Sequence, residues 1–301
     1  MKNKNFDVII VGGSYSGLSA GMSLGRSLRK VLIIDNGKPC NRQTPHSHNF
    51  ITHDGRTPAE ITQLAKKDIE KYSTVQFYNG TVTKTTKISE GFEIETSAGE
   101  KLYANKLILA SGVKDIMPNI PGFEECWGIS VLHCPYCHGY EVKNEVTGIL
   151  SNGDMAYEFS KLIFNMTKSL TLFTNGKAVL TDEQIEKLNQ NKIILNEDEI
   201  ARIEQEKGSI QKIVFKNGKE ADLQVLYAKI PFEQNLNVSG DLGCELTEQG
   251  FIKVDMMQKT NIPGVFACGD NVTMMRSVAN AVAQGNFTGA VVNKELVDNE
   301  F

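Results

Sequence analysis

The stretch FDVIIVGGSYSGLSAGMSLGRSLRKVLIID, residues 6–35, constrains the fold of this chain more than any other. A short apolar run is followed at once by glycines, then by a segment of small residues and a second apolar run. This order predicts a buried strand, a tight turn, a helix and a second, parallel strand. An acid, Asp35, ends the second run about twenty residues after the turn, a spacing typical of dinucleotide-binding βαβ units.

The residues of the turn suit a phosphate ligand. Gly12 permits the sharp turn, and Gly17 lets the helix pack close to the strand. Ser14 takes the middle glycine position and keeps the backbone accessible. The helix N-terminus then offers N–H groups and a positive dipole end to a pyrophosphate, and Asp35 can accept hydrogen bonds from ribose hydroxyls. The alternative is a glycine turn of the kind that any α/β protein can contain.

The chain carries the same plan twice. Residues 82–112 alternate as a β-meander that ends in a buried strand. Residues 146–176 again read as strand, turn, helix and strand, and residues 208–231 form a second meander with a buried last strand. The chain then returns with NIPGVFACGDN, residues 261–271, and a long helix from about Arg276 to Leu296.

This repeat predicts an α/β fold with two Rossmann-like, three-layer (ββα) nucleotide-binding domains, the second inserted into the first. Residues 1–114 and 236–301 are expected to form the first, discontinuous domain. Residues 115–235 are expected to form the inserted domain. In the first domain, TPAEITQLAKKDIEKYS predicts a helix that starts near Thr57, with Pro58 early in it.

Composition excludes several classes of protein. The 301 residues carry a net charge of −4, so no overall basic field attracts nucleic acid. The apolar run near the N-terminus is too short for a signal peptide, and no segment approaches the length of a membrane span. We therefore expect a cytoplasmic protein that binds neither nucleic acid nor membranes.

The stretch HCPYCHGYE, residues 133–141, contains the two cysteines that lie close together among six. Its spelling fits a redox disulfide, half a zinc site, a haem attachment point or two passive buried thiols. The four His and Cys side chains are too contiguous to surround one zinc ion, and covalent haem attachment normally needs export. Two sulfurs at i and i+3 can close a small, reducible ring, so a redox disulfide between Cys134 and Cys137 is favoured. If this segment opens a helix, the dipole favours a thiolate, and His138 could shuttle its proton or could merely cap the turn.

The order of glycine turn, meander, CxxC, second nucleotide-like unit and GVFACGD resembles the low-molecular-weight thioredoxin reductases, which are class II pyridine nucleotide-disulfide oxidoreductases. The resemblance covers essentially the whole chain. It implies FAD on the first domain, with Gly269 and Asp270 at its ribityl and phosphate region and RSVANAVAQG beside its isoalloxazine. It also implies a homodimer, with Cys137 facing the flavin and Cys134 exchanging with a thioredoxin-like protein or a small dithiol.

The chain departs from that family where NADPH would bind. The glycine-type turn of the second unit falls on Ser151, Gly153 and Ala156, and its first position is serine. The segment Thr174–Gly176 stands where the family has a His-Arg-Arg cluster for the 2′-phosphate. A dianionic phosphate without its cationic partners loses its strongest hydrogen bonds, so NADPH use is doubtful and NADH is not positively supported.

A second departure is His138, because thioredoxin reductases usually carry aspartate there. Together with CNRQTPHSHNFITHDGRTPAEI and CPYCHGYE, it makes the chain similar to the branch of gliotoxin- and holomycin-type dithiol oxidases. Ferredoxin-dependent thioredoxin reductases also lack NADPH determinants. Three hypotheses remain open: a reductase supplied by NAD(P)H or ferredoxin, an oxidase that passes electrons to oxygen, and a non-catalytic flavin redox sensor.

The expected site residues follow from the motifs and the resemblance. Arg42 could meet the FAD phosphates or adenosine, and His46, His48 and His53 lie in a loop expected to border the flavin. Cys40 and Cys268 are expected to be packing residues, and Cys126 and Trp127 to anchor the domain linker or shape a substrate groove. The predicted catalytic residues are Cys134, Cys137 and His138; the predicted FAD-binding residues are Gly12, Ser14, Ser16, Gly17, Asp35, Asn36, Arg42, His48, Val82, Ala110, Ser111, Gly112, Gly269, Asp270, Ser277 and Val278.

Overall fold

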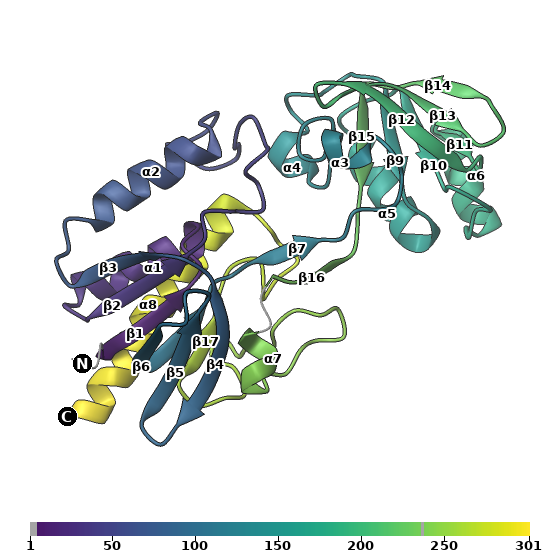
Figure 1. Ribbon diagram of the computed structural model, residues 1–301. Coiled ribbons are helices and arrows are strands. Elements are labelled where there is room, and N and C mark those ends of the chain that lie inside the picture. The colour runs from purple at the N-terminus through teal and green to yellow at the C-terminus, as the bar shows by residue number, and fades with distance from the viewer. Residues whose placement is uncertain (1–4, 236–237) are drawn as a thin grey trace. The chain divides into compact units, whose positions relative to one another are not determined.

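The structure is a computed structural model that describes residues 5–235 and 238–301 (Figure 1). The chain divides into two compact units. Unit 1 contains the chain up to Arg42, Phe50–Lys114 and the chain from Phe232 onward, and unit 2 contains Gln43–Asn49 and Asp115–Pro231. Both units are α/β with parallel sheets, which confirms the predicted fold class.

The predicted βαβ unit is present at the start of unit 1. Strand β1 (Asn5–Val11) pairs in parallel with β2 (Val31–Asp35), and helix α1 (Tyr15–Arg26) connects them. Gly12 has φ +108°, and a Cβ there would lie 2.2 Å from the carbonyl oxygen of Ala110. Only glycine therefore fits the turn that starts the helix.

Unit 1 is built on one mixed seven-stranded sheet of order β3-β2-β1-β6-β5-β4, with β17 also paired to β6. The long strand β6 has different partners along its length: its first half pairs antiparallel with β5, and its second half pairs parallel with β17. The sheet therefore forks, and the meander leaves it on one side of the parallel core. The further strands are β3 (Val75–Asn79), β4 (Val82–Ile88), β5 (Gly91–Thr96), β6 (Lys101–Leu109) and β17 (Val265–Ala267).

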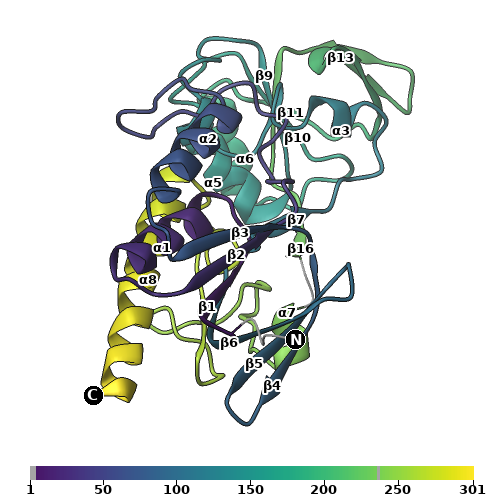
Figure 2. The ribbon, with the colours of Figure 1, turned by 60° about the vertical axis from the view of Figure 1, so that its left-hand side comes forward.

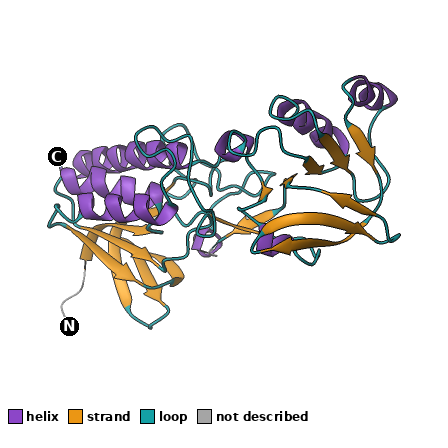
Figure 3. Ribbon diagram, turned by 90° about the horizontal axis from the view of Figure 1, so that it is seen from above, coloured by secondary structure: helices purple, strands orange, loops and turns teal. Residues whose placement is uncertain are grey.

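Helices cover one face of this sheet (Figure 3). Apolar residues of β1 and β2 alternate between two cores: Ile10 and Ile33 pack under the helices, and Ile9 and Ile34 pack toward the meander. This alternation explains the continuous apolar runs, because strands covered on both faces need no polar side. The helices are α1, α2 (Pro58–Ile69) and α8 (Val278–Glu300), and a short α7 (Val238–Leu242) packs with the meander.

Helices α1 and α8 run side by side (Figure 2). They can approach closely because Gly285 and Gly289 have no side chains. A Cβ on Gly285 would lie 2.0 Å from the carbonyl oxygen of Ser16, and one on Gly289 would lie 2.7 Å from the Cβ of Ser23. The predicted helix from about Arg276 to Leu296 is found two residues later at its start, because Ser277 is its N-cap and accepts from the Asn280 amide.

Unit 2 repeats this plan with one strand broken in two. Its parallel sheet has the order β11-β10-β9-β15-β8, and its meander forms a separate sheet, β12-β13-β14. The role of β6 is divided between β14 (Glu220–Asp222), which pairs with the meander, and β15 (Val225–Ala228), which pairs with the parallel strands. The other strands are β8 (Val131–Leu132), β9 (Thr147–Leu150), β10 (Leu170–Phe173), β11 (Ile194–Asn196), β12 (Ile200–Glu206) and β13 (Ser209–Phe215), and the helices are α3 (Phe123–Cys126), α4 (Pro135–His138), α5 (Gly153–Ile163) and α6 (Asp182–Gln190).

The chain passes between the units through β7 (Val113–Asp115) and β16 (Phe232–Gln234), which pair with each other. The heptapeptide Gln43–Asn49 belongs to unit 2 although the residues on both sides of it belong to unit 1. No feature of the sequence predicted that these seven residues belong to unit 2.

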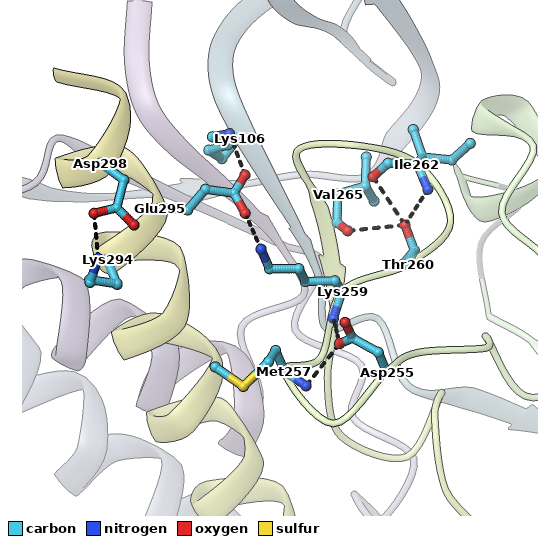
Figure 4. Close-up of polar contacts among 10 residues, drawn as sticks. All are labelled: Lys106, Asp255, Met257, Lys259, Thr260, Ile262, Val265, Lys294, Glu295 and Asp298. Carbon is cyan, nitrogen blue, oxygen red and sulfur yellow. Dashed lines mark hydrogen bonds and ion pairs between the residues drawn. The ribbon is translucent and has the colours of Figure 1, made fainter.

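A partly buried acid links α8 to the sheet of unit 1 (Figure 4). Glu295 accepts from Lys106 on β6 and pairs with Lys259, each at 2.6 Å. Burial alone would raise the pKa of Glu295, but the hydrogen bonds from both lysines outweigh burial and hold that pKa below its ordinary value of 4.5. The ionised carboxylate therefore stabilises the fold at neutral pH, and this contribution is lost as the pH falls below about 4.5.

We expect Glu295→Gln to lower the free energy of unfolding at pH 7 by about 2 kcal/mol, because Lys106 would keep its charge without an ionised partner. The difference from wild type should shrink as the pH falls below 4.5. Urea unfolding at several pH values measures both effects. Glu158→Gln, in an exposed pair with Lys161, is the control and should change little. A loss that does not depend on pH would contradict the ionic role.

Candidate functional site: a nucleotide turn and a redox disulfide

The glycine turn of unit 1 is shaped for close approach of a ligand. A Cβ on Gly17 would lie 1.9 Å from the carbonyl oxygen of Gly12, so the first turn of α1 packs directly on the end of β1. Asp35 Oδ1 accepts from the Gly13 amide at 3.0 Å, and its Oδ2 accepts from the Gly37 amide at 3.2 Å. These bonds hold the carboxylate at the carboxyl end of β2, next to the turn.

The start of α1 differs from that of two other helices. Helices α2 and α6 are capped by Thr57 and Thr181, each in a capping box. In α1, Ser14 makes no side-chain capping bond, and the first turn carries no acid. A pyrophosphate at this end would take the place of a cap, so the residues present fit the phosphates of a dinucleotide.

Two further loops meet the turn at the same edge of the sheet. The Ala110 amide donates to the Val11 carbonyl, and the Cys268 amide donates to the Leu109 carbonyl. A Cβ on Gly269 would lie 2.5 Å from Ser16 Oγ, and the Gly269 amide donates to Gln284. The structure thus brings together these predicted FAD residues: Gly12, Ser14, Ser16, Gly17, Asp35, Ala110, Ser111, Gly112, Gly269 and Asp270.

Other predicted residues lie in different surroundings. Asn36 is exposed and accepts from the Lys38 amide, and Arg42 is exposed and donates to the Pro39 carbonyl. Val82 is buried in the core at the start of β4. Ser277 and Val278 begin α8, and Val278 packs against a small cluster that includes Tyr15. Their roles toward FAD stay predictions.

The redox motif begins directly after β8. Cys134 and Cys137 form a disulfide with Cα atoms 5.3 Å apart, and the one-turn helix α4 connects them. The Cys137 amide also approaches Cys134 Sγ at 3.2 Å. Because both sulfurs are bonded to each other, neither serves as a metal or haem ligand in this state. Strand β8 occupies in unit 2 the place of β17 in unit 1, so the CxxC stands where unit 1 has Gly269 and Asp270.

A group of ionisable side chains surrounds the end of α4. The ring of His48 lies edge-on to that of His138, with centroids 6.4 Å apart, and His48 Nδ1 lies 3.4 Å from Glu141 Oε1. The His46 ring lies 6.3 Å from that of His48. Burial, and to a smaller extent His48, lowers the pKa of His138, while Glu141 acts in the opposite direction. At neutral pH His138 is therefore an uncharged imidazole that can accept a proton from a thiol.

The residue before the disulfide packs on an aromatic stack. The rings of Phe123 and Trp127 are stacked 5.8 Å apart, and His133 lies 6.0 Å from Trp127. Trp127 Nε1 donates to Asp115 at 3.2 Å. Both Trp127 and Cys126 are buried, which agrees with an anchor at the domain linker rather than with the wall of a groove.

The remaining cysteines are separate from the disulfide. Cys268 is fully buried, and burial raises the pKa of its thiol to about 12, which agrees with its expected packing role. Cys40 is only half-buried, and its Sγ lies 3.7 Å from Asp270 Oδ2. It contacts a predicted cofactor residue rather than an apolar core, which the sequence did not indicate.

The nucleotide-like turn of unit 2 is tied to the next loop by one side chain. Asn152 Oδ1 accepts from the amides of Gly153 and Val179, both at 2.8 Å. Its Nδ2 donates to the carbonyls of Lys177 at 2.9 Å and Thr174 at 3.4 Å. We call these four bonds the Asn152 bridge. The bridge occupies the N-terminus of α5, where the phosphates of a nucleotide would otherwise bind.

The acid Glu197 lies against the same loop. Its carbonyl accepts from the Gly176 amide, and its Oε1 accepts from the Ala178 amide at 2.7 Å. The place expected for a 2′-phosphate thus holds a carboxylate and no arginine. The residues present do not fit NADPH.

Sequence reasoning missed several residues that shape these sites. No individual role was predicted for Glu141, Asn152 and Gln284, which act through contacts with distant loops, although Glu141 lies in CPYCHGYE and Gln284 in RSVANAVAQG. Gly285 could have been found, because it recurs with Gly289 at i and i+4, a spacing that places both on one helix face.

Two nucleotide-binding-type units, one holding a turn suited to a dinucleotide and the other a disulfide, define a flavin-linked disulfide oxidoreductase. The model of the family described as pyridine nucleotide-disulphide oxidoreductase matches residues 6–285, and the chain belongs to this family. It is a thioredoxin reductase-like enzyme that moves electrons between a flavin, the Cys134–Cys137 disulfide and an external thiol or disulfide.

Particular relatives support the branch predicted from the sequence. The chain is 30% identical over 302 residues to the thioredoxin reductase tcpT of Claviceps purpurea, covering 97% of this chain and 94% of that protein. The putative thioredoxin reductase TrxB of Bacillus anthracis has a TM-score of 0.94 and 31% identity over 98% of this chain and 100% of its own. An oxidoreductase of Agrobacterium tumefaciens has a TM-score of 0.92 and 35% identity, over 98% and 99%. The similarity to gliotoxin-type enzymes is confirmed.

FAD is the cofactor of this class of enzyme. The uncapped start of α1, the close approach at Gly12 and the oriented Asp35 carboxylate fit it. Within residues 5–235 and 238–301, no cluster of three or more His, Cys, Asp or Glu side chains could hold a metal ion. No helix of the described chain has the length and apolar character of a membrane span.

Proposed function

We propose that this enzyme oxidises a dithiol to a disulfide and passes the electrons to oxygen. The observation that carries the proposal is the Asn152 bridge, which fills the place where NAD(P)H would bind with the protein's own side chain. In this proposal the electrons enter through the thiols rather than through a pyridine nucleotide. The overall balance is one dithiol and one O₂ to one disulfide and one H₂O₂.

The chemistry at the disulfide follows from the groups present. A substrate thiol gives its proton to His138, and the resulting thiolate attacks Cys134, so that the Cys134–Cys137 bond breaks and Cys137 leaves as thiolate. The second substrate thiol then attacks the mixed disulfide, which releases the oxidised substrate and leaves both protein cysteines reduced. FAD, when bound, supplies the two-electron acceptor that restores the disulfide.

The direction is tested by anaerobic titration of the FAD-loaded protein with NADPH, NADH and dithiothreitol in parallel. We expect dithiothreitol to bleach the flavin absorbance and the two nicotinamides to leave it unchanged over minutes. About two dithiols should be consumed per flavin, because the Cys134–Cys137 disulfide and the flavin each take up two electrons. Admitting air should restore the colour and produce one H₂O₂ per dithiol. Rapid bleaching by NADPH would overturn the oxidase, and failure of the dithiol to bleach the flavin would overturn thiol chemistry altogether. Persistent reduction in air would exclude oxygen as the acceptor.

A second candidate function is supported by the relatives, which are named thioredoxin reductases. In this version a thioredoxin-like protein is reduced at Cys134, and ferredoxin rather than NADPH supplies the electrons. Reduced ferredoxin with oxidised thioredoxin and this enzyme would then yield free thioredoxin thiols. Multiple turnovers with any thiol partner would also exclude the non-catalytic sensor.

The parts of the chain are assigned by the same proposal. We assign FAD binding to residues 1–114 and 236–301 and the redox motif to the inserted residues 115–235, and the division of the chain into two compact units supports this assignment. A homodimer in the cytoplasm is proposed from the resemblance alone. Light scattering of the purified protein tests the dimer.

A further inference from the structure

The segment Gln43–Asn49 is held on unit 2 by packing that a larger residue would disturb. A Cβ on Gly128 would lie 3.0 Å from Thr44 Oγ1 and 3.3 Å from the Cγ of Gln43. Ser47, in the middle of the segment, is buried. These contacts place His48 beside the redox motif, about ninety residues away in the sequence.

Two residues with opposite charge effects face His138. The His48 side chain is 18% exposed and that of Glu141 is 37% exposed, and their closest polar atoms are 3.4 Å apart. His48 lowers the pKa of His138 by disfavouring a second positive charge nearby, and Glu141 raises it by attraction. Burial is the largest influence and acts in the same direction as His48.

The other ionisable groups around the cluster do not replace this pair. His46 faces His48 rather than His138. Tyr227, on β15, is buried, and both burial and Glu141 raise the pKa of its phenol, so it stays neutral across the working range of pH. The two sulfurs on α4 are bonded to each other in the oxidised state.

We propose that His48 and Glu141 are positioning residues that act in opposition on His138 and so decide how readily it takes the proton of an incoming thiol. His48 lies edge-on to the His138 ring, and its Nδ1 lies 3.4 Å from the Glu141 carboxylate, so a base and an acid both neighbour His138. This inference rests on the proposed function of His138 as proton acceptor. It assigns His48 to the disulfide of unit 2, although its predicted role was cofactor binding.

The test uses histidine ¹³C-labelled at Cε1 in the FAD-loaded protein, with NMR titration of the ring signals. There are five histidines, and His138→Gln identifies the signal of His138 by its loss. We expect His48→Gln to move the His138 midpoint to higher pH and Glu141→Gln to move it to lower pH. In His48→Gln/Glu141→Gln the two shifts should largely cancel. His53→Gln, a half-buried histidine of unit 1 that contacts Phe50, is the matched control and should leave the midpoint unchanged.

The rate of flavin reduction by dithiothreitol, measured against pH, gives the second readout. Its acid limb should move in the same direction as the NMR midpoint, so that at pH 6 His48→Gln is slower and Glu141→Gln faster than wild type. Shifts of the same sign in both variants, or no shift in either, would overturn the proposal. Because the NMR titration needs no turnover, opposite shifts in a protein that no dithiol reduces would overturn the proposed function and leave the electrostatic pair intact.

Discussion

Replacing Cys137 by serine is expected to lower the rate of flavin reduction by dithiothreitol by at least about a thousandfold, because a serine hydroxyl cannot form or leave a disulfide. The remaining Cys134 keeps its place before α4 and stays able to form a mixed disulfide. Stopped-flow absorbance measures the rate. Mass spectrometry after treatment with an activated aromatic disulfide should find a stable adduct on Cys134.

The matched control is Cys244→Ser, which changes a buried cysteine of unit 1 outside both sites. Its rate should stay close to that of wild type. In Cys134→Ser the adduct should form on Cys137 more slowly, if Cys134 is the exchanging sulfur. A Cys137→Ser enzyme that keeps a tenth or more of the wild-type rate would show that the disulfide does not carry the electrons.

Alanine at Gly17 should cost about 3 kcal/mol of unfolding free energy and remove most of the bound FAD. The added Cβ would press against backbone atoms, which cannot turn aside as a side chain can. The added Cβ would lie 1.9 Å from the Gly12 carbonyl oxygen and 3.3 Å from Ile10 Cγ2. To relieve the clash α1 must move away from β1, and its N-terminus then no longer reaches the phosphates. The ratio of flavin to protein absorbance and urea unfolding measure the two effects.

Gly99→Ala is the control for the effect of a positive φ without a steric clash. Gly99 also has a positive φ of +76°, but a Cβ there would have no neighbour within 4 Å. We expect a cost of about 1 kcal/mol, from the left-handed backbone conformation, and full flavin content. If Gly17→Ala retained a full complement of FAD, the close packing of α1 on β1 would not be what forms the cofactor site.

The predictions that the structure confirms depend on local physics. The apolar run before Gly12 and the acid at Asp35 lie within one βαβ unit, and the helix after Thr57 begins with a capping box. The Cys134–Cys137 disulfide also closes within one helical turn. In each case the residues that decide the outcome are neighbours in the chain, so spacing and residue type suffice.

In unit 2 two strands, β14 and β15, take the place that β6 has in unit 1. This difference could not be predicted in the same way. Both meanders read as alternating runs that end in a buried strand, and only the pairing partners separate one nine-residue strand from two short ones. Strand propensity depends on which neighbours cover the strand, and the sequence does not name them.

By itself the sequence determined the class of this protein: two nucleotide-type units, a dinucleotide turn and a redox CxxC, because these features are set by residues close together in the chain. Tertiary structure alone decided what surrounds the chemistry. It placed His48 and Glu141 beside His138 and closed the second nucleotide turn with Asn152. Such contacts join loops that are far apart in the sequence. They leave no regular spacing of residue types from which they could be predicted.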